Sequence, residues 1–365
     1  MTVAPQSAAG LFANMHAAQL AFMDQMRGAQ ARTLDLFGFS PHECPYEVIA
    51  TGPHWRLRRY EGAAEGAPLL LVPAPIKRPY IWDLTPAVSA VRFCLDRKLA
   101  VHLLEWLPPS EDGRTGIEAY AGAIVEAANI IAGKRGGARP FVIGHSLGGT
   151  LAAIACALDP SRASGLVLLG SPLSFEAGSS PFRDLVAAQP PPAADGTVPG
   201  SQLSQACALL SPGTFVWSRW MDGLACLTDR AAFDLHVHVV RWALDEVPLP
   251  GRLVHEIVEW LYREDRFHRS RLVLGGRTLG PETLRVPVLA IVGDGDEIGP
   301  RASVEPFFAR MKASETTIIE HPAEVGVGLQ HLAILAGRRA HAQTWPAIAG
   351  WIDSHARSQP HRAAS

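Results

Sequence analysis

The sequence predicts an α/β fold in which a mostly parallel central sheet is covered by helices on both faces. Short apolar runs, at residues 68–73, 99–106 and 165–169, alternate with longer segments of helical periodicity. A glycine-rich turn joins one further apolar run directly to a helix within residues 139–158. With 365 residues, 48 % of them apolar, the chain is long enough to bury the core of a large domain.

The N-terminal region predicts a tail followed by a helix. Residues 1–10 are expected to form a loose tail. Residues 11–28 carry an apolar stripe at helical spacing, formed by Leu11, Met15, Ala18, Phe22 and Met26. We expect this stripe to dock on the domain or on a second subunit; the alternative is a face for a partner or a lipid-like surface. The few lysines and arginines on the polar side argue against a membrane.

The first half of the sheet is predicted from strand and helix signals in chain order. Residues 46–51 and 54–60 predict two strands joined by a Gly-Pro turn. The elements expected next are two buried strands, 68–73 and 99–106, and two helices, 86–97 and 117–133.

Residues 139–158 predict a strand, a tight turn and a helix of small apolar residues. The turn carries Ser146, with Gly144 two positions before it and Gly148 two positions after it. Such a strained turn needs very small residues at these two positions. The N–H of Leu147, at the start of the helix, points toward an oxyanion developing at the serine. This arrangement is typical of the nucleophile of α/β hydrolases, so the sequence predicts the α/β-hydrolase fold with Ser146 as nucleophile.

After residue 171 the alternation of strands and helices stops. Residues 172–285 are predicted to be a cap inserted over the active site, with a loop or lid segment at 177–200 and helices over 201–268. The tryptophans of this region, which indicate either an apolar tunnel or the cap's own core, are Trp217, Trp220, Trp242 and Trp260. The remaining domain boundaries are an N-terminal tail and helix at 1–40 and a core at 41–171 and 286–365. Strands at 286–292 and 316–320 and a helix at 345–355 complete that core.

A serine hydroxyl needs a base, and the base needs an acid that fixes its tautomer. In this fold the acid follows the strand after the cap, and the histidine follows the last strand. The candidate acids are Asp294, Asp296 and Glu297. The candidate bases are His321, His331 and His341; we favour His331, because it follows a glycine-containing loop and opens an apolar helix.

The second oxyanion donor is expected from the loop after the strand at 68–73. Pro73 and Pro75 have no N–H, so the backbone of Ile76 is the first candidate. Lys77 and Arg78 follow, and they either meet an anionic group of the substrate or are simply solvated.

Composition excludes several function classes. The formal net charge of −2 and the scattered arginines argue against nucleic acid. Five separated cysteines without a C-x-x-C pair indicate neither a zinc site nor disulfides, and a reducing cytoplasm fits them. We expect no signal peptide, no membrane span and no metal, since the histidines of the cap form no convincing ligand set.

Five stretches of the chain resemble polyhydroxyalkanoate synthases of the PhaC type. They are residues 72–84 (VPAPIKRPYIWDL), 101–106, 272–277, 286–300 and 345–352 (WPAIAGWI). The resemblance covers roughly residues 45–355. It implies the α/β-hydrolase fold, a hydroxyacyl-coenzyme A substrate, and a partner subunit for a chain of this length.

Carried over residue by residue, the resemblance assigns the site. Ser146 stands where the family has a nucleophilic cysteine, and the proline that closes the acid segment selects Asp296. His331 matches the family histidine, although Gln330 and Ala333 replace the glycines that flank it in the family pattern. A serine acyl-enzyme is an ordinary ester whose common fate is hydrolysis.

The leading expectation is therefore a serine hydrolase acting on hydroxyacyl or fatty acyl esters or thioesters, or on the polymer itself. The first alternative is acyl transfer or polymer synthesis with serine as nucleophile. The second is a weakly active binding or granule-associated protein, motivated by the apolar N-terminal helix and the altered histidine loop. A homodimer or a partner subunit, no cofactor and a cytoplasmic location are expected.

Overall fold

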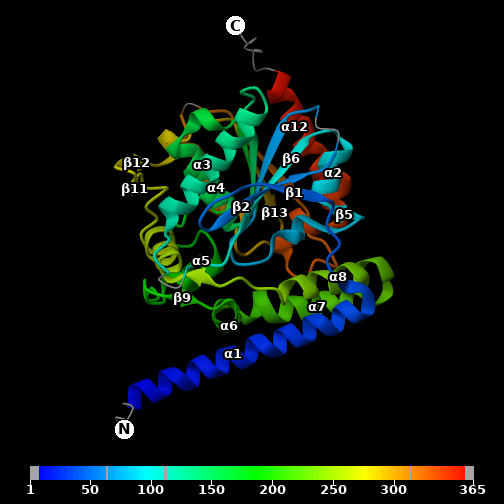
Figure 1. Cartoon of the computed structure of the whole chain (residues 1–365), viewed down its shortest axis with the longest axis vertical. Coiled ribbons are helices and arrows are strands. Elements are labelled where there is room, and N and C mark those ends of the chain that lie inside the picture. The colour runs from blue at the N-terminus through cyan, green and yellow to red at the C-terminus, as the bar shows by residue number, and fades with distance from the viewer. Residues whose placement is uncertain (1–7, 63–64, 111–112, 313, 358–365) are drawn as a thin grey trace.

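The computed structural model describes residues 8–62, 65–110, 113–312 and 314–357. A twisted sheet forms the centre of the molecule, and helices cover both of its faces (Figure 1). This is the mostly parallel α/β architecture that the strand–helix alternation predicts.

The main sheet has eight strands in the order β1-β2-β6-β3-β7-β8-β13-β14. They span β1 (Tyr46–Thr51), β2 (Trp55–Tyr60), β3 (Pro68–Val72), β6 (Ala100–Trp106), β7 (Phe141–His145), β8 (Gly165–Leu169), β13 (Val288–Gly293) and β14 (Thr316–His321). β2 is antiparallel to both of its neighbours, while the strands from β6 to β14 pair in parallel. The carboxyl ends of the parallel strands therefore meet at one edge, where ligands bind in such sheets.

Side chains of the buried strands alternate between two apolar layers. In β3, Leu70 and Val72 pack in the layer that contains α3 (Ile117–Lys134) and α4 (Leu147–Leu158). Leu69 and Leu71 pack in the opposite layer, whose helices are α2 (Ala90–Asp96), α11 (Ala333–Ala336) and α12 (Trp345–Arg357). Burial on both faces explains why β3 is a continuous apolar run in the sequence.

A mainly helical segment, here called the insertion, joins β8 to β13. Its helices are α5 (Pro181–Ala187), α6 (Gly200–Leu210), α7 (Ser218–Ala225), α8 (Arg230–Ala243) and α9 (Gly251–Glu256). Two small ribbons belong to it, β9 (Thr197–Val198) with β10 (Leu249–Pro250) and β11 (Leu272–Leu274) with β12 (Arg277–Leu279). α10 (Glu305–Arg310) lies between β13 and β14.

Short 3-10 and π segments lie between or next to these helices and strands. They are η1 (Asp35–Phe39), η2 (Pro79–Trp82), η3 (Pro160–Arg162), η4 (Gly213–Trp217), η5 (Cys226–Thr228), η6 (Ile257–Arg263), η7 (Pro281–Thr283), η8 (Arg301–Ser303), η9 (Gln330–Leu332) and η10 (Ala340–Thr344).

The helix predicted at 86–97 begins later than expected. Residues Asp83–Thr85 and Val88–Ser89 form a small antiparallel pair, β4 and β5, and α2 begins only at Ala90. The hydroxyl of Ser89 accepts the N–H of Arg92, which makes Ser89 the N-cap of the helix. The capping serine, rather than Pro86, therefore sets the start of α2.

The N-terminal helix α1 (Ala8–Leu34) runs beneath the insertion, and Figure 1 shows it crossing under α6, α7 and α8. The stripe that we predicted to dock on the domain or on a second subunit does not dock on the domain. Met15, Phe22 and Met26 are 60 %, 62 % and 48 % exposed, whereas Leu20 and Ala31 are buried. Because α1 is apolar on more than one side, the stripe at helical spacing did not identify the docked face.

Polar contacts anchor the end of α1 on the insertion. Arg27 donates to the carbonyl of Ala243 (2.7 Å) and to the carboxylate of Glu246 (2.9 Å). Arg241 of α8 forms a bidentate pair with Asp35 in η1, at 2.7 and 3.1 Å. Among the described helices, none is long and apolar enough to cross a membrane.

Candidate active site

Ser146 lies on the turn between β7 and α4 with φ 54° and ψ −134°. A positive φ in a residue with a side chain costs about 1–3 kcal/mol and is maintained by its surroundings. A Cβ added to Gly144 would lie 2.4 Å from the Cα of Gly149, and one added to Gly148 would lie 2.4 Å from the carbonyl of Val72. The two glycines of the motif are therefore required by close backbone approach.

Asp296 and His331 form a buried hydrogen-bonded pair. The Nδ1 of His331 lies 2.9 Å from the Oδ2 of Asp296, and the two residues are only 5 % and 4 % exposed. The Oδ1 of Asp296 accepts the N–H groups of Ile298 (2.8 Å) and Gly299 (3.0 Å). Burial raises the pKa of Asp296, but His331 and these N–H donors outweigh it, so the net pKa lies below the usual range. The carboxylate is therefore ionised and can fix the histidine tautomer.

The carboxylates of the two neighbouring candidate acids are not paired with His331. Asp294 and Glu297 are exposed, and the Glu297 carboxylate accepts the hydroxyl of Thr214 from the insertion. Asp294 contacts His321 only through its backbone N–H. Of the three candidate carboxylates, that of Asp296 alone is hydrogen-bonded to the ring of a candidate histidine within the described chain.

His331 lies beside the serine turn. The ring of His145, the residue before Ser146, donates from Nε2 to the carbonyl of His331 at 3.0 Å, and the two ring centroids are 4.8 Å apart. The Nε2 of His331 is buried and has no hydrogen-bond partner among the described residues. That nitrogen is the one a serine base must use, since Nδ1 faces Asp296.

His145 is a residue whose role the sequence reasoning missed, although it stands inside the serine motif. Burial, together with the nearby His331, lowers the pKa of His145 to about 3, so the ring is neutral at physiological pH. Its neutral N–H holds the backbone of His331 without placing a second positive charge beside it.

The other candidate histidines are engaged elsewhere. His321 is 1 % exposed, and its ring nitrogens pair with Thr344 (2.8 Å) and Glu324 (2.9 Å). His341 stacks on Trp345 and donates from Nε2 to the carbonyl of Leu335 at 3.1 Å, and burial lowers its pKa to about 4.

The loop after β3 packs against the start of α4. A Cβ on Gly148 would meet the carbonyl of Pro73, and that carbonyl also accepts the indole N–H of Trp106 at 2.8 Å. Leu147 is the first residue of α4, so its N–H is among those without an intrahelical acceptor. The carbonyl of Ile76 accepts the N–H of Val247 from the insertion. The loop and the helix start are thus adjacent, as the oxyanion prediction requires.

Lys77 differs from both expectations. Its Nζ donates to the carbonyl of Ala243 (2.6 Å) and to Glu246 (2.7 Å), and burial lowers its pKa to about 8. Its ammonium group is neither solvated nor open to a substrate anion, because it is hydrogen-bonded to residues of the insertion. These contacts connect the loop after β3 to the insertion. Arg78, by contrast, is exposed.

The tryptophans of the insertion are divided between its core and its surface. Trp242 is 8 % exposed, and its indole donates to the carbonyl of Arg78, while Trp217 and Trp220 are 65 % and 68 % exposed. At least these two therefore line no tunnel in this structure.

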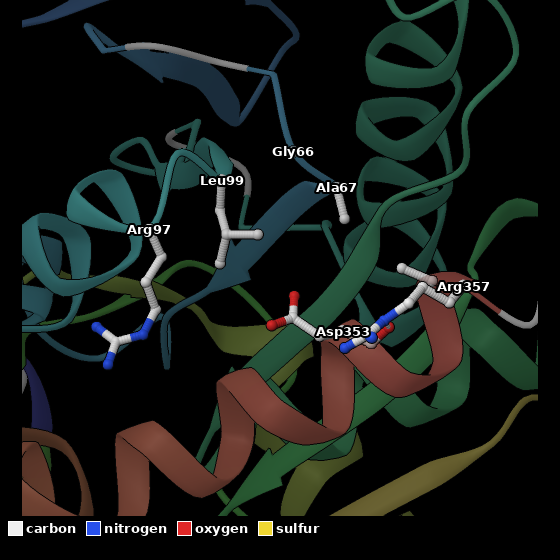
Figure 2. Close-up of a pocket in the computed structure, with 7 residues that line it drawn as sticks. Gly66, Ala67, Arg97, Leu99, Asp353 and Arg357 are labelled. Carbon is white, nitrogen blue, oxygen red and sulfur yellow. Dashed lines mark hydrogen bonds between the residues drawn. The ribbon is translucent and has the colours of Figure 1, made fainter.

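A cavity of about 440 Å³ lies away from the serine turn. Gly66, Ala67 and Leu99 line it next to the amino ends of β3 and β6, with Asp353 and Arg357 of α12 opposite (Figure 2). Ser146 follows the carboxyl end of β7, so the cavity and the serine are at opposite edges of the sheet. The cavity has no part in the candidate chemistry.

Two side-chain clusters combine residue types that bind metals. They are Asp222 with Cys226 and His236, and Glu176 with Asp265 and His268. In the second cluster Asp265 accepts the N–H of Phe175 (2.8 Å) and faces His268 (3.0 Å), which joins the beginning and the end of the insertion. Hydrogen bonds within the protein join Asp222 to His236 in the first cluster and Asp265 to His268 in the second.

Comparison with known proteins agrees with this fold. The family model of the alpha/beta hydrolase fold matches residues 114–212, which include the serine turn. The chain is 26 % identical over 340 residues to the poly(3-hydroxyalkanoate) polymerase subunit PhaC of Haloferax mediterranei, covering 90 % of this chain and 68 % of that one. It is 24 % identical over 333 residues to the PhaC subunit of Synechocystis sp., with 86 % and 85 % covered.

Solved structures support the fold alone. The monoacylglycerol lipase of Paleococcus ferrophilus aligns with a TM-score of 0.51 and 18 % identity, over 84 % of this chain and 100 % of that one. A thermophilic esterase from Thermogutta terrifontis aligns with a TM-score of 0.50 and 16 % identity, over 86 % and 99 %. The chain is therefore an enzyme with the α/β-hydrolase fold, and it is similar in sequence to polymerase subunits named PhaC.

Proposed function

We propose that the chain forms a serine acyl-enzyme and hydrolyses hydroxyacyl or fatty acyl esters or thioesters. Ser146 is the nucleophile, His331 the base and Asp296 the acid. The observation that carries this proposal is the buried Asp296–His331 pair. His145 holds the backbone of His331 beside the serine turn, and the Nε2 of His331 has no hydrogen-bond partner among the described residues.

The reaction follows from these positions. The Nε2 of His331 takes the hydroxyl proton as the oxygen of Ser146 attacks the acyl carbon, and the N–H groups of Leu147 and Ile76 stabilise the oxyanion. The C–O or C–S bond then breaks, and the leaving group takes the proton from His331. A water molecule, activated by the same nitrogen, attacks the acyl-enzyme ester and releases the free acid.

Acyl transfer to a hydroxyl group of another acyl chain is the second candidate. The relatives named poly(3-hydroxyalkanoate) polymerase subunits favour it, and so does their alignment over most of this chain. The two candidates share the acyl-enzyme and differ only in whether water or an alcohol attacks it.

The test combines a serine probe with a thioester substrate. Purified wild type, Ser146→Ala and the control Ser161→Ala, which changes an exposed serine after α4, are treated with a fluorophosphonate probe. Wild type and Ser161→Ala should be labelled and Ser146→Ala should not. Equal labelling of Ser146→Ala and wild type, or no labelling of the wild type, would contradict the proposal.

The same proteins are then given 3-hydroxybutyryl-coenzyme A, and thiol release and product size are followed. Thiol release with free acid supports hydrolysis, whereas thiol release with polymer supports acyl transfer. Both must disappear in Ser146→Ala.

A further inference from the structure

Asp222, on α7 of the insertion, holds the loop that precedes His331. Its Oδ1 accepts the N–H of Gly326 and its Oδ2 accepts the N–H of Gly328, each at 2.8 Å. The hydroxyl of Ser218, also on α7, lies 3.5 Å from the carbonyl of Gly328. One helix of the insertion therefore contacts the histidine loop through two side chains.

The carboxylate of Asp222 is itself well supported. The Nδ1 of His236, on α8, lies 2.7 Å from its Oδ2, and the Asp222 side chain is only 9 % exposed. Three N–H donors thus surround one buried carboxylate, which is a strong arrangement for an anion. Because both oxygens accept N–H groups, we interpret the cluster with Cys226 as a hydrogen-bonded clamp and not as a metal site.

The loop between β14 and His331, here called the histidine loop, depends on such contacts because its glycines allow the backbone many conformations. Gly326 and Gly328 have φ values of 96° and 69°, a region that only glycine occupies without strain. Within the loop itself, the side chain of Gln330 is hydrogen-bonded to the backbone of Glu324. Its Oε1 accepts the Glu324 N–H (3.0 Å), and its Nε2 donates to the Glu324 carbonyl (2.7 Å). Between these two residues, Asp222 supplies the contacts from the insertion.

We propose that Asp222 is a positioning residue, which fixes the loop through Gly326 and Gly328 and thereby holds His331 beside Ser146. The inference rests on the proposed role of His331 as base. Since Asp222 belongs to the insertion, any displacement of α7 releases the loop, and the placement of the insertion is coupled to the base.

The test uses the full-length protein and measures the rate of Ser146 labelling by a fluorophosphonate and the turnover of p-nitrophenyl butyrate. Asp222→Ala should lower both the labelling rate and kcat about ten- to hundredfold, because a displaced base loses its alignment, with KM changed less than about twofold. Asp222→Asn retains one acceptor oxygen and should lose less. Asp234→Ala, which removes an exposed carboxylate of the same insertion, should match wild type.

A double-mutant cycle separates positioning from a merely structural role. In a His331→Ala background, adding Asp222→Ala should cause no further loss, since no histidine is left to position. Wild-type rates in Asp222→Ala, or the same fold-loss in both backgrounds, would overturn the proposal. If Asp222→Ala does not fold, Asp222→Asn is judged by the same two criteria.

The outcome also distinguishes this inference from the proposed function. A wild type without labelling at Ser146 overturns the proposed function and this inference with it. A labelled wild type with an unaffected Asp222→Ala overturns only the positioning role.

Discussion

The imidazole of His145 donates its Nε2 proton to the backbone carbonyl of His331 across 3.0 Å. The residue before the proposed nucleophile thereby holds the backbone of the proposed base. This contact joins the turn after β7 to the loop after β14, two segments that are 186 positions apart in the chain.

Replacing His145 should slow the chemistry without changing substrate binding. In His145→Phe the ring is kept but the N–H is lost, and one net hydrogen bond is worth about 1 kcal/mol. We expect the rate of Ser146 labelling by a fluorophosphonate to fall about five- to tenfold. His102→Gln, at a buried histidine in β6, is the control and should label at the wild-type rate. An unchanged rate in His145→Phe would show that His331 is held by other contacts.

Gly170 leaves room for the acid–base pair. With φ 53°, an added Cβ would lie 3.0 Å from the Oδ2 of Asp296 and 3.3 Å from the Nδ1 of His331. Gly170→Ala should therefore push the pair apart and lower kcat about tenfold or more. Gly275→Ala is a matched control, because Gly275 has φ 54° and its nearest contact is 3.9 Å away.

Both glycine variants carry similar backbone strain, so the melting temperature should fall in both, and it should fall further in Gly170→Ala because its Cβ also contacts the buried pair. The activity loss should be confined to Gly170→Ala. Equal kcat values in the two variants would contradict this account of the pair.

Ser146→Cys should change the fate of the acyl group. A cysteine acyl-enzyme is a thioester, close in energy to a coenzyme A thioester, so transfer to an alcohol competes better with hydrolysis than from a serine ester. We expect a larger ratio of oligomeric product to free acid from 3-hydroxybutyryl-coenzyme A. The measurement is product size against thiol release, with Ser146→Ala as the blank. Free acid as the sole product of both enzymes would contradict the prediction.

Stability should fall as the pH decreases from about 7 toward 4. Burial lowers the pKa of His102 and of His341 to about 4, so the folded protein keeps both rings neutral where the unfolded chain binds protons. The unfolded state then binds more protons, and the free energy of unfolding decreases as the pH falls. For His102, the difference between the usual pKa of about 6.5 and a pKa of about 4 corresponds to about 3 kcal/mol.

Urea denaturation between pH 8 and pH 4 measures this slope. His102→Gln removes one titrating group while keeping an N–H that can reach the carbonyls of Leu69 and Ala100, which the ring contacts in the wild type. Its stability should depend less on pH over the same range. Identical slopes for the variant and wild type would show that His102 is not buried as described.

Local patterns in the sequence are enough for much of this protein. Apolar runs bounded by turns predict β3, β6, β7 and β8, because strands buried on both faces must be continuously apolar. The spacing of Gly144, Ser146 and Gly148 predicts the turn itself, since steric limits on backbone dihedrals act within a few residues.

Other features were decided only by the tertiary structure, because they depend on partners far away in the chain. Chain order alone left three candidate acids and three candidate histidines. Asp296 and His331 pair because β13 and β14 are neighbouring parallel strands, so the loops that follow them are adjacent. The burial of Lys77 against Glu246 has no local signal, and neither does the clamp of Asp222 on Gly326. The docked face of α1 was undetermined for the same reason: a helix that is apolar on several sides is oriented by the surface on which it packs.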